Sequence, residues 1–169
     1  MAGFMSASIW LKIALITLLT GTLLYVIGFA TVSWMTLWSA RQHWAYGLWE
    51  QRACHGGSCG TGAVRYRYSE DWQRATQALE VLGLICNLLA LLILLLYMFV
   101  DQCRRRNALI ATIVFIFAAV FFIVVGIAIF AIKLEERGFS VGWSMGIAIV
   151  GAIFMFVAGI MSILHSLGR

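Results

Sequence analysis

Residues 107–132, with the sequence NALIATIVFIFAAVFFIVVGIAIFAI, decide the fold, because this run contains no Asp, Glu, Lys or Arg. A helix needs about 20 predominantly apolar residues to cross a hydrocarbon core of about 30 Å. Three further stretches are free of charged residues and reach that length: 13–40, 81–100 and 138–168. The sequence therefore predicts four transmembrane helices.

The composition of the 169-residue chain supports this prediction. Apolar residues make up 63% of the chain and charged residues only 11%, whereas soluble domains have about 45–50% and about 25%. A soluble protein of this size could not bury so much apolar surface, and a disordered chain has the opposite bias. No residue is proline, so none of the helices requires a proline kink.

The charge-free stretches divide the chain into spans and loops, which we treat as one domain over residues 1–169. The first apolar run is too long for the core of a secretory signal, so we expect it to be a retained span with Trp10 and Trp34 as interfacial anchors. We predict spans at about 9–34, 78–100, 108–132 and 141–165, a long loop at about 35–77, and short loops at about 101–107 and 133–140.

Positive charge near the helix ends predicts the orientation. Arg104, Arg105 and Arg106 are consecutive and adjoin two predicted helix ends, where the positive-inside bias acts most strongly. Lys12 and Arg169 fall on the same side of the membrane. The closely spaced cysteines of the long loop suit an oxidising exterior. We therefore expect a multi-pass plasma-membrane protein with both termini in the cytoplasm.

The sequence CHGGSC at residues 54–59 predicts a β-hairpin. Its two adjacent glycines suit a type I′ turn, which needs a positive φ at both positions. His55 and Ser58 then form the hydrogen-bonded pair beside the turn, and Cys54 and Cys59 form the next, closer pair. The Cα separation of that pair lies within the range that a disulfide accepts. Two free thiols, or half of a metal site, are the alternatives.

Alternating residues predict a further strand in the long loop. Val64, Tyr66 and Tyr68 alternate with Arg65 and Arg67, which is the period of a strand with one aromatic and one cationic face. The cationic face is either solvated or contacts ions or a partner, in which case Arg65 and Arg67 are the candidates. We expect strands at about 33–38, 46–54 and 59–68, and a short helix at about 70–77.

Several of these residues together resemble the signature of a known family. The pattern consists of Trp34, then Gly47, Leu48 and Trp49, and then Cys54 and Cys59. It resembles the W-GLW-C-C signature of the claudin superfamily, which includes the peripheral myelin protein, the epithelial membrane proteins and the lens fibre membrane protein. Arg74 ahead of the second span, and Gly142 with Trp143 at the start of the fourth, are similar to the family as well.

The resemblance implies a fold and a role. The fold would be mainly α-helical: a left-handed bundle of four transmembrane helices beneath a small extracellular antiparallel β-sheet. The role would be cell–cell adhesion, a paracellular barrier or membrane organisation, at the plasma membrane and its cell junctions, with self-association in cis and in trans. The alternative is an auxiliary subunit of an ion channel or receptor complex. If the chain lines a paracellular pathway, the excess of Arg over acidic residues in the long loop predicts anion preference.

Residues in and beside the spans give further expectations. Gly142 and Gly146 have a GxxxG spacing, which permits close helix packing within the monomer or in a dimer. Cys103 is either a palmitoylation site or a free juxtamembrane thiol. Lys12 and Glu80 lie near the ends of spans, where we expect both side chains to reach the membrane surface.

The patterns that enzymes and nucleic-acid-binding proteins need are missing from the sequence. We find no Ser-His-Asp set, phosphate-binding glycine loop or HExxH motif, so we expect no enzymatic activity, no cofactor and no metal. The formal net charge is +5, but the basic residues are divided between opposite faces of the membrane, so we expect no nucleic-acid partner. Membrane lipids are the expected surroundings. Transport by the chain itself would need a polar route, for which the spans offer only Asn87 and some Thr and Ser residues.

Overall fold

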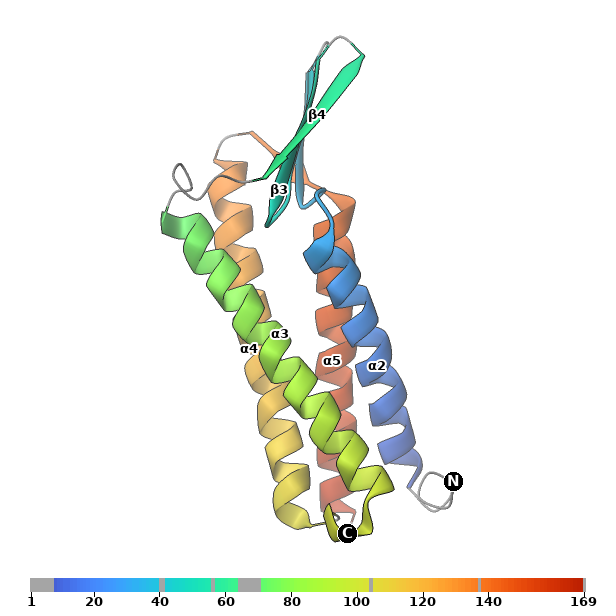
Figure 1. The fold of residues 1–169 in the computed structure, drawn as a ribbon. Helices are drawn as coiled ribbons and strands as arrows, with labels where there is room; N and C mark the ends of the chain where they lie inside the picture. The colour runs from blue at the N-terminus through green and yellow to red at the C-terminus, as the bar shows by residue number, and fades with distance from the viewer. Residues whose placement is uncertain are drawn as a thin grey trace.

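A computed structural model describes residues 8–39, 42–55, 57–63, 71–103, 105–136 and 138–168. Four long helices run side by side, and a small sheet extends beyond them at one end (Figure 1). The helices are α2 (Ile9–Ala30), α3 (Asp71–Phe99), α4 (Arg106–Glu135) and α5 (Trp143–Leu167), with the short 3₁₀ helix η1 (Asp101–Cys103) between α3 and α4. The strands are β1 (Met35–Ser39), β2 (Gln42–Tyr46), β3 (Glu50–His55), β4 (Ser58–Ala63) and β5 (Ser140–Val141).

Each of the four helices is long enough to cross a membrane. The shortest, α2, has 22 residues and the longest, α4, has 30, which at 1.5 Å per residue correspond to about 33 Å and about 45 Å. All four are also apolar enough to span a bilayer. The predicted fold, four membrane-spanning helices with a small antiparallel sheet, is confirmed.

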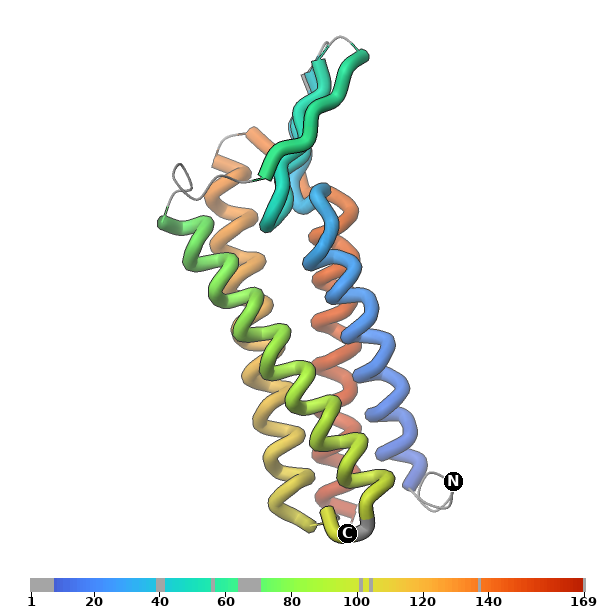
Figure 2. Tube along the Cα trace, viewed as in Figure 1, coloured from blue at the N-terminus to red at the C-terminus, as the bar shows by residue number. Residues whose placement is uncertain are grey.

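The helices pack as two close pairs, α2 with α5 and α3 with α4 (Figure 2). Glycines bring the first pair together: a Cβ atom added to Gly21 or to Gly151 would lie 2.8 Å from the carbonyl oxygen of the other. On α3, Gly83 packs against the side chain of Ile123 on α4. The two pairs meet mainly between α4 and α5, whereas α2 and α3 share the sparsest of these four contacts.

The first helix ends before the predicted end of its span. Thr31 has an extended backbone, with ψ 154°, and the chain then turns toward the sheet. Trp34 is fully buried, with its ring centroid 5.3 Å from that of Phe130 and its indole N–H donating to the Gly28 carbonyl at 2.6 Å. The prediction of Trp34 as an interfacial anchor is therefore wrong, because its ring closes the sheet-side end of the helix core.

The second helix begins earlier than expected. Asp71 starts α3, and the helix continues to Phe99 without interruption, so residues 71–77 are its first turns rather than a separate short helix. The physical reason lies in the sequence, since no glycine occurs between Asp71 and Gly83 and the chain contains no proline. Trp72 in the first turn packs on Phe130, with ring centroids 5.9 Å apart.

The sheet is antiparallel, with the strand order β4-β3-β2-β1-β5. The predicted single strand over 46–54 is wrong, because β2 ends at Tyr46 and β3 begins at Glu50. The Gly47 N–H donates to the Glu50 carbonyl at 2.9 Å and closes a tight turn between the two strands. The two-residue strand β5, which pairs with β1, was not predicted. Residues 64–68 of the third predicted strand lie outside the described part of the chain.

Candidate functional site: the sheet and its attachment to the helices

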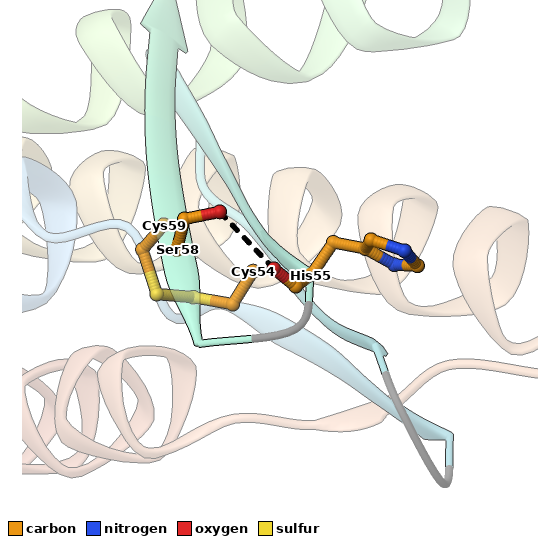
Figure 3. The surroundings of a disulfide bond; sticks show 4 residues. All are labelled: Cys54, His55, Ser58 and Cys59. Atoms are coloured by element: carbon orange, nitrogen blue, oxygen red, sulfur yellow. Dashed lines mark hydrogen bonds between the residues drawn. A yellow bond between two sulfur atoms is a disulfide. The ribbon is translucent and has the colours of Figure 1, made fainter.

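The hairpin of β3 and β4 carries the predicted disulfide. Cys54 and Cys59 are directly opposite each other in the register and are bonded, with a Cα separation of 4.0 Å. His55 and Ser58 form the pair beside the turn, and the Ser58 hydroxyl donates to the His55 carbonyl at 3.1 Å. Gly57 in the turn has φ +91°, a conformation that favours glycine. Figure 3 shows the His55 ring pointing away from the disulfide, as expected for neighbouring residues on opposite faces of a strand.

A row of side chains crosses the sheet near its outer tip, the end farthest from the helices. Trp38 pairs with His43, His43 with Cys54, and Cys54 with Cys59, so the four residues share one face of the sheet. The rings of Trp38 and His43 are stacked, with centroids 4.0 Å apart. The Trp38 side chain is nevertheless 74% exposed. The row therefore combines a rigid covalent link with an exposed aromatic group.

Strand β4 is an open edge of the sheet. Its six residues, with the sequence SCGTGA, are all exposed and include no charged residue, and among the described residues it pairs with β3 alone. An edge strand presents unpaired N–H and C=O groups to any approaching strand. Most proteins protect such an edge with charges, proline or a covering element. Residues 58–63 of β4 include neither a charged residue nor a proline.

The sheet is fixed to the helices by the turn Gly47, Leu48 and Trp49, which we call the GLW turn. Gly47 passes so close to the end of α2 that an added Cβ would lie 2.7 Å from the Cα of Val32. Leu48 is fully buried, and its carbonyl accepts a hydrogen bond from the Gln77 amide at 2.7 Å. Trp49 contacts Phe29 edge to face, with ring centroids 5.3 Å apart. All three residues therefore attach the sheet to the bundle.

A second attachment joins the start of β1 to the start of α5. The Gly142 N–H donates to the Trp34 carbonyl at 2.8 Å, and the Ser144 N–H donates to the Ser33 carbonyl at 3.1 Å. A Cβ at residue 142 would overlap the Ser33 carbonyl oxygen, so only glycine fits there. This residue thus serves the junction between sheet and helix rather than a contact between two helices.

Within this chain the predicted GxxxG pair makes no close contact between helices, and its use in a dimer stays a prediction. Gly142 contacts the segment before β1, and a Cβ added to Gly146 would have no atom within 4 Å. Close contacts between α2 and α5 are made instead by Gly151, which faces Gly21, and by Gly28, which faces Ser144 and Ala148.

The sequence profile of the PMP-22/EMP/MP20/Claudin family matches residues 5–162. This match spans nearly the whole chain, including the four helices, the sheet and its disulfide. The chain belongs to this family. A search of curated proteins finds no match. Of the residues predicted from the family signature, Trp34, Gly47, Leu48 and Trp49 lie together where the sheet joins the bundle. Cys54 and Cys59 bond at the other end of the sheet, near its outer tip.

The other predicted site residues lie apart from this region or outside the described residues. Arg74 is exposed in the first turn of α3. Arg65 and Arg67, the candidates for contact with ions or a partner, lie outside the described part of the chain. Cys103 is a free, partly buried thiol in η1. The connection from α3 to α4, to which η1 belongs, lies at the end of the bundle opposite the sheet (Figure 1). Among the described residues, no three His, Cys, Asp or Glu side chains are grouped to hold a metal.

The structure corrects the expectation for Glu80. Its side chain is fully buried, and the Tyr25 hydroxyl donates to its Oε2 at 2.6 Å and to its backbone carbonyl at 3.0 Å. The side chain therefore turns into the bundle instead of reaching the membrane surface. Deeper in the bundle, the Asn87 amide donates to the Thr22 hydroxyl at 2.9 Å. The spacing of Gln77, Glu80 and Asn87, which puts all three on one helix face, could have revealed this buried row.

An apolar groove lies between α4 and α5, midway along both helices. It encloses about 430 Å³, and no polar atom lines it. A groove at this depth faces the hydrocarbon of a bilayer. Its lining includes Val120, Val124 and Ile127 on α4 and Ile149, Ile153 and Phe156 on α5.

Proposed function

We propose that this chain is a cell-surface member of its family that organises membrane contacts by pairing its sheet with a second copy. The observation that carries the proposal is the edge position of β4, whose six exposed, uncharged residues have no second neighbouring strand among the described residues. An extended strand of another copy can add to such an edge through main-chain hydrogen bonds. Trp38 supports the same role, because exposed tryptophans are enriched among residues that dominate binding energy at interfaces.

The proposed orientation places the sheet outside the cell and both termini in the cytoplasm. α2 begins and α5 ends at the same end of the bundle, opposite the sheet (Figure 1). Arg105 and Arg106 lie at that end too, at the start of α4, and positively charged residues favour the cytoplasmic side. The disulfide lies at the other end, where an oxidising environment would maintain it.

The first test is imaging of a fluorescent fusion in cells that lack related proteins. Cells expressing the fusion are mixed with cells that do not express it. Enrichment at contacts between two expressing cells, and not at contacts with a single expressing cell, supports homotypic pairing between membranes. A uniform distribution at both kinds of contact contradicts the adhesive role.

A matched pair of variants at Thr61 then tests the β4 edge itself. The ladder alternates from the pair beside the turn, so the Thr61 N–H points away from β3 toward the open edge. Thr61→Pro removes this N–H, whereas Thr61→Val keeps it and preserves the shape of the side chain. We expect contact enrichment to be lost in Thr61→Pro and kept in Thr61→Val. Equal enrichment in both variants would show that the β4 edge is not the contact surface.

The second candidate function is that of an auxiliary subunit of an ion channel or receptor complex. The apolar groove between α4 and α5 favours it, because a transmembrane helix of a larger partner could pack there. Ala152 on α5 also lines the groove, so Ala152→Phe would fill it. If this function is the correct one, the variant loses co-purification with a channel while wild-type protein retains it, and enrichment at cell contacts is absent in both.

A charge-selective pathway is a further part of the proposal, with Arg65 and Arg67 as the residues that favour anions. The test is the permselectivity of a cell layer that expresses the chain. Replacing both arginines by glutamate should shift the preference toward cations, and an unchanged ratio of anion to cation permeability would exclude these two residues.

A further inference from the structure

A row of buried polar side chains runs along one face of α3. Gln77, Glu80 and Asn87 are separated by three and seven residues, which places them on the same side of a helix. Glu80 and Asn87 are fully buried and Gln77 is 7% exposed. The row begins beside the sheet and continues into the part of the bundle that crosses the membrane.

The members of the row bond to two neighbouring elements, the GLW turn and α2. Gln77 donates to the Leu48 carbonyl in the GLW turn at 2.7 Å. Glu80 accepts from the Tyr25 hydroxyl of α2 at 2.6 Å, both of them buried. Asn87 donates to Thr22, one helical turn before Tyr25 on α2, at 2.9 Å. One face of α3 thus holds both the sheet and the first helix.

These bonds occur where the helices otherwise pack least. The bundle consists of two close pairs, α2 with α5 and α3 with α4, and the contact between α2 and α3 is sparse. Two side-chain hydrogen bonds, from Tyr25 and from Asn87, cross this gap. Hydrocarbon offers no alternative hydrogen-bond partner to these groups, so separating α2 from α3 would leave them unsatisfied.

Helix α4 also contacts the Glu80 carboxyl group, which lies on α3 and bonds to α2. A Cβ added to Gly126 would overlap Oε1 of Glu80, so the bare backbone of this glycine makes the space for the carboxyl group. Oε1 has no hydrogen-bond partner among the described residues. The position of the carboxyl group is therefore set by Tyr25 on one side and by Gly126 on the other.

We infer that Glu80 is a positioning residue, which holds α3 against α2 through Tyr25 and thereby, through Gln77 on the same helix face, fixes the GLW turn and the sheet over the bundle. Its importance for function rests on the proposed role of the sheet as the contact surface. The contacts that Glu80, Tyr25 and Gln77 make do not depend on which partner the sheet meets.

The test measures hydrogen exchange of the full chain in lipid nanodiscs, with peptides that cover the GLW turn compared with peptides from α4 and α5. Tyr25→Phe removes one hydroxyl and keeps the ring, so this variant is the main perturbation. We expect exchange in the GLW turn to become about five to ten times faster, because the variant lacks the one hydroxyl that both the Glu80 carboxyl group and the Glu80 backbone carbonyl accept from. Glu80→Gln keeps an acceptor for the Tyr25 hydroxyl and should stay within about twofold of wild type.

Two combinations distinguish positioning from a general loss of stability. Tyr25→Phe and Gln77→Ala act on the same turn, so the double variant should exchange little faster than the faster single variant. Gly126→Ala should accelerate exchange because its methyl group displaces the Glu80 carboxyl. In a Glu80→Ala background the same methyl group should add nothing, because the group that it would displace is gone. Gly146→Ala, where the added methyl group meets no atom, is the control.

Three results would overturn the inference. The first is unchanged exchange of the GLW turn in Tyr25→Phe. The second is an equal acceleration in α4 and α5, which would indicate a loss of overall stability. The third is a fully additive effect of Tyr25→Phe and Gln77→Ala. Because exchange is measured on isolated protein, a failure of the cell-contact experiment with these results intact would refute the proposed function alone.

Discussion

Replacing Gly151 by alanine should separate α2 from α5 and destabilise the bundle. An added Cβ at this position would lie 2.8 Å from the Gly21 carbonyl oxygen and 2.8 Å from the Tyr25 nitrogen. Both atoms belong to the backbone, so no side chain can rotate away to make room. Gly146 on the same helix offers a matched control, because a Cβ there would have no atom within 4 Å.

The magnitude follows from the distances. Ordinary van der Waals contact of a Cβ begins at 3.4 Å, so the helices must move apart by about 0.6 Å, a gap that forfeits roughly a quarter to a half of the dispersion energy of the atom pairs along the contact. Overpacking of this kind costs about 1–3 kcal/mol. Replacing glycine by alanine inside a helix contributes about 0.5–1 kcal/mol of stability, and this gain is common to both variants because both positions lie in α5. The free energies of unfolding of the two variants should therefore differ by the overpacking cost alone, about 1–3 kcal/mol.

The assay is reversible unfolding in mixed micelles, with the fraction of folded protein followed as the denaturing detergent is increased. The free energy of unfolding should fall in Gly151→Ala and rise slightly in Gly146→Ala. If Gly151→Ala proves as stable as Gly146→Ala, the close approach of α2 and α5 at this position is refuted.

Three further predictions concern the sheet and its attachment. Replacing both Cys54 and Cys59 by serine should destabilise the hairpin by about 2 kcal/mol, the chain-entropy value for so small a loop, and hydrogen exchange should accelerate in β3 and β4 with the helices unaffected; equal exchange with and without the disulfide would contradict this. Trp34→Phe keeps an aromatic ring but removes the N–H that donates to Gly28, so the free energy of unfolding should fall by about 1 kcal/mol, whereas the same change at the partly exposed Trp10 should have little effect. Gly47→Ala should lower the free energy of unfolding by more than about 1 kcal/mol, because its Cβ would meet the Val32 backbone. The measurement is thermal unfolding, and Gly62→Ala, with open space around the added Cβ, is the control.

The helices and the hairpin could be predicted because the signals for both are local. Absence of charge over about 20 residues is enough to identify a span, and the turn residues of CHGGSC fix the register that brings Cys54 to Cys59. The strand limits could not be predicted in the same way. Gly47 stands inside the segment predicted as one strand, and it forms a turn because the chain there must pass against Val32. That close approach joins segments that are distant in sequence, so periodicity does not reveal it.

The burial of Glu80 escaped prediction for a related reason. A charged residue beside a charge-free stretch suggests a side chain at the membrane surface, and Glu80 directly precedes the stretch at 81–100. The actual helix begins at Asp71, so Glu80 lies more than two turns inside it. Which face of the helix then meets α2 depends on the tertiary packing. The burial of Glu80 is matched by one further residue in the sequence, Gly126 on α4, which leaves room for the carboxyl group.

The positions of the signature residues bear on what the family resemblance can explain. Trp34 and Leu48 are buried, Gly47 is pressed against backbone, and the two cysteines bond to each other. These residues shape the sheet and attach it to the bundle, so the signature accounts for the common architecture. Selection of a partner requires groups that a partner can touch. In the function that we propose, those groups are Trp38 and the residues of β4 other than Cys59, which are not part of the signature. Differences in function between proteins that share this fold should then follow changes at the edge and the tip of the sheet.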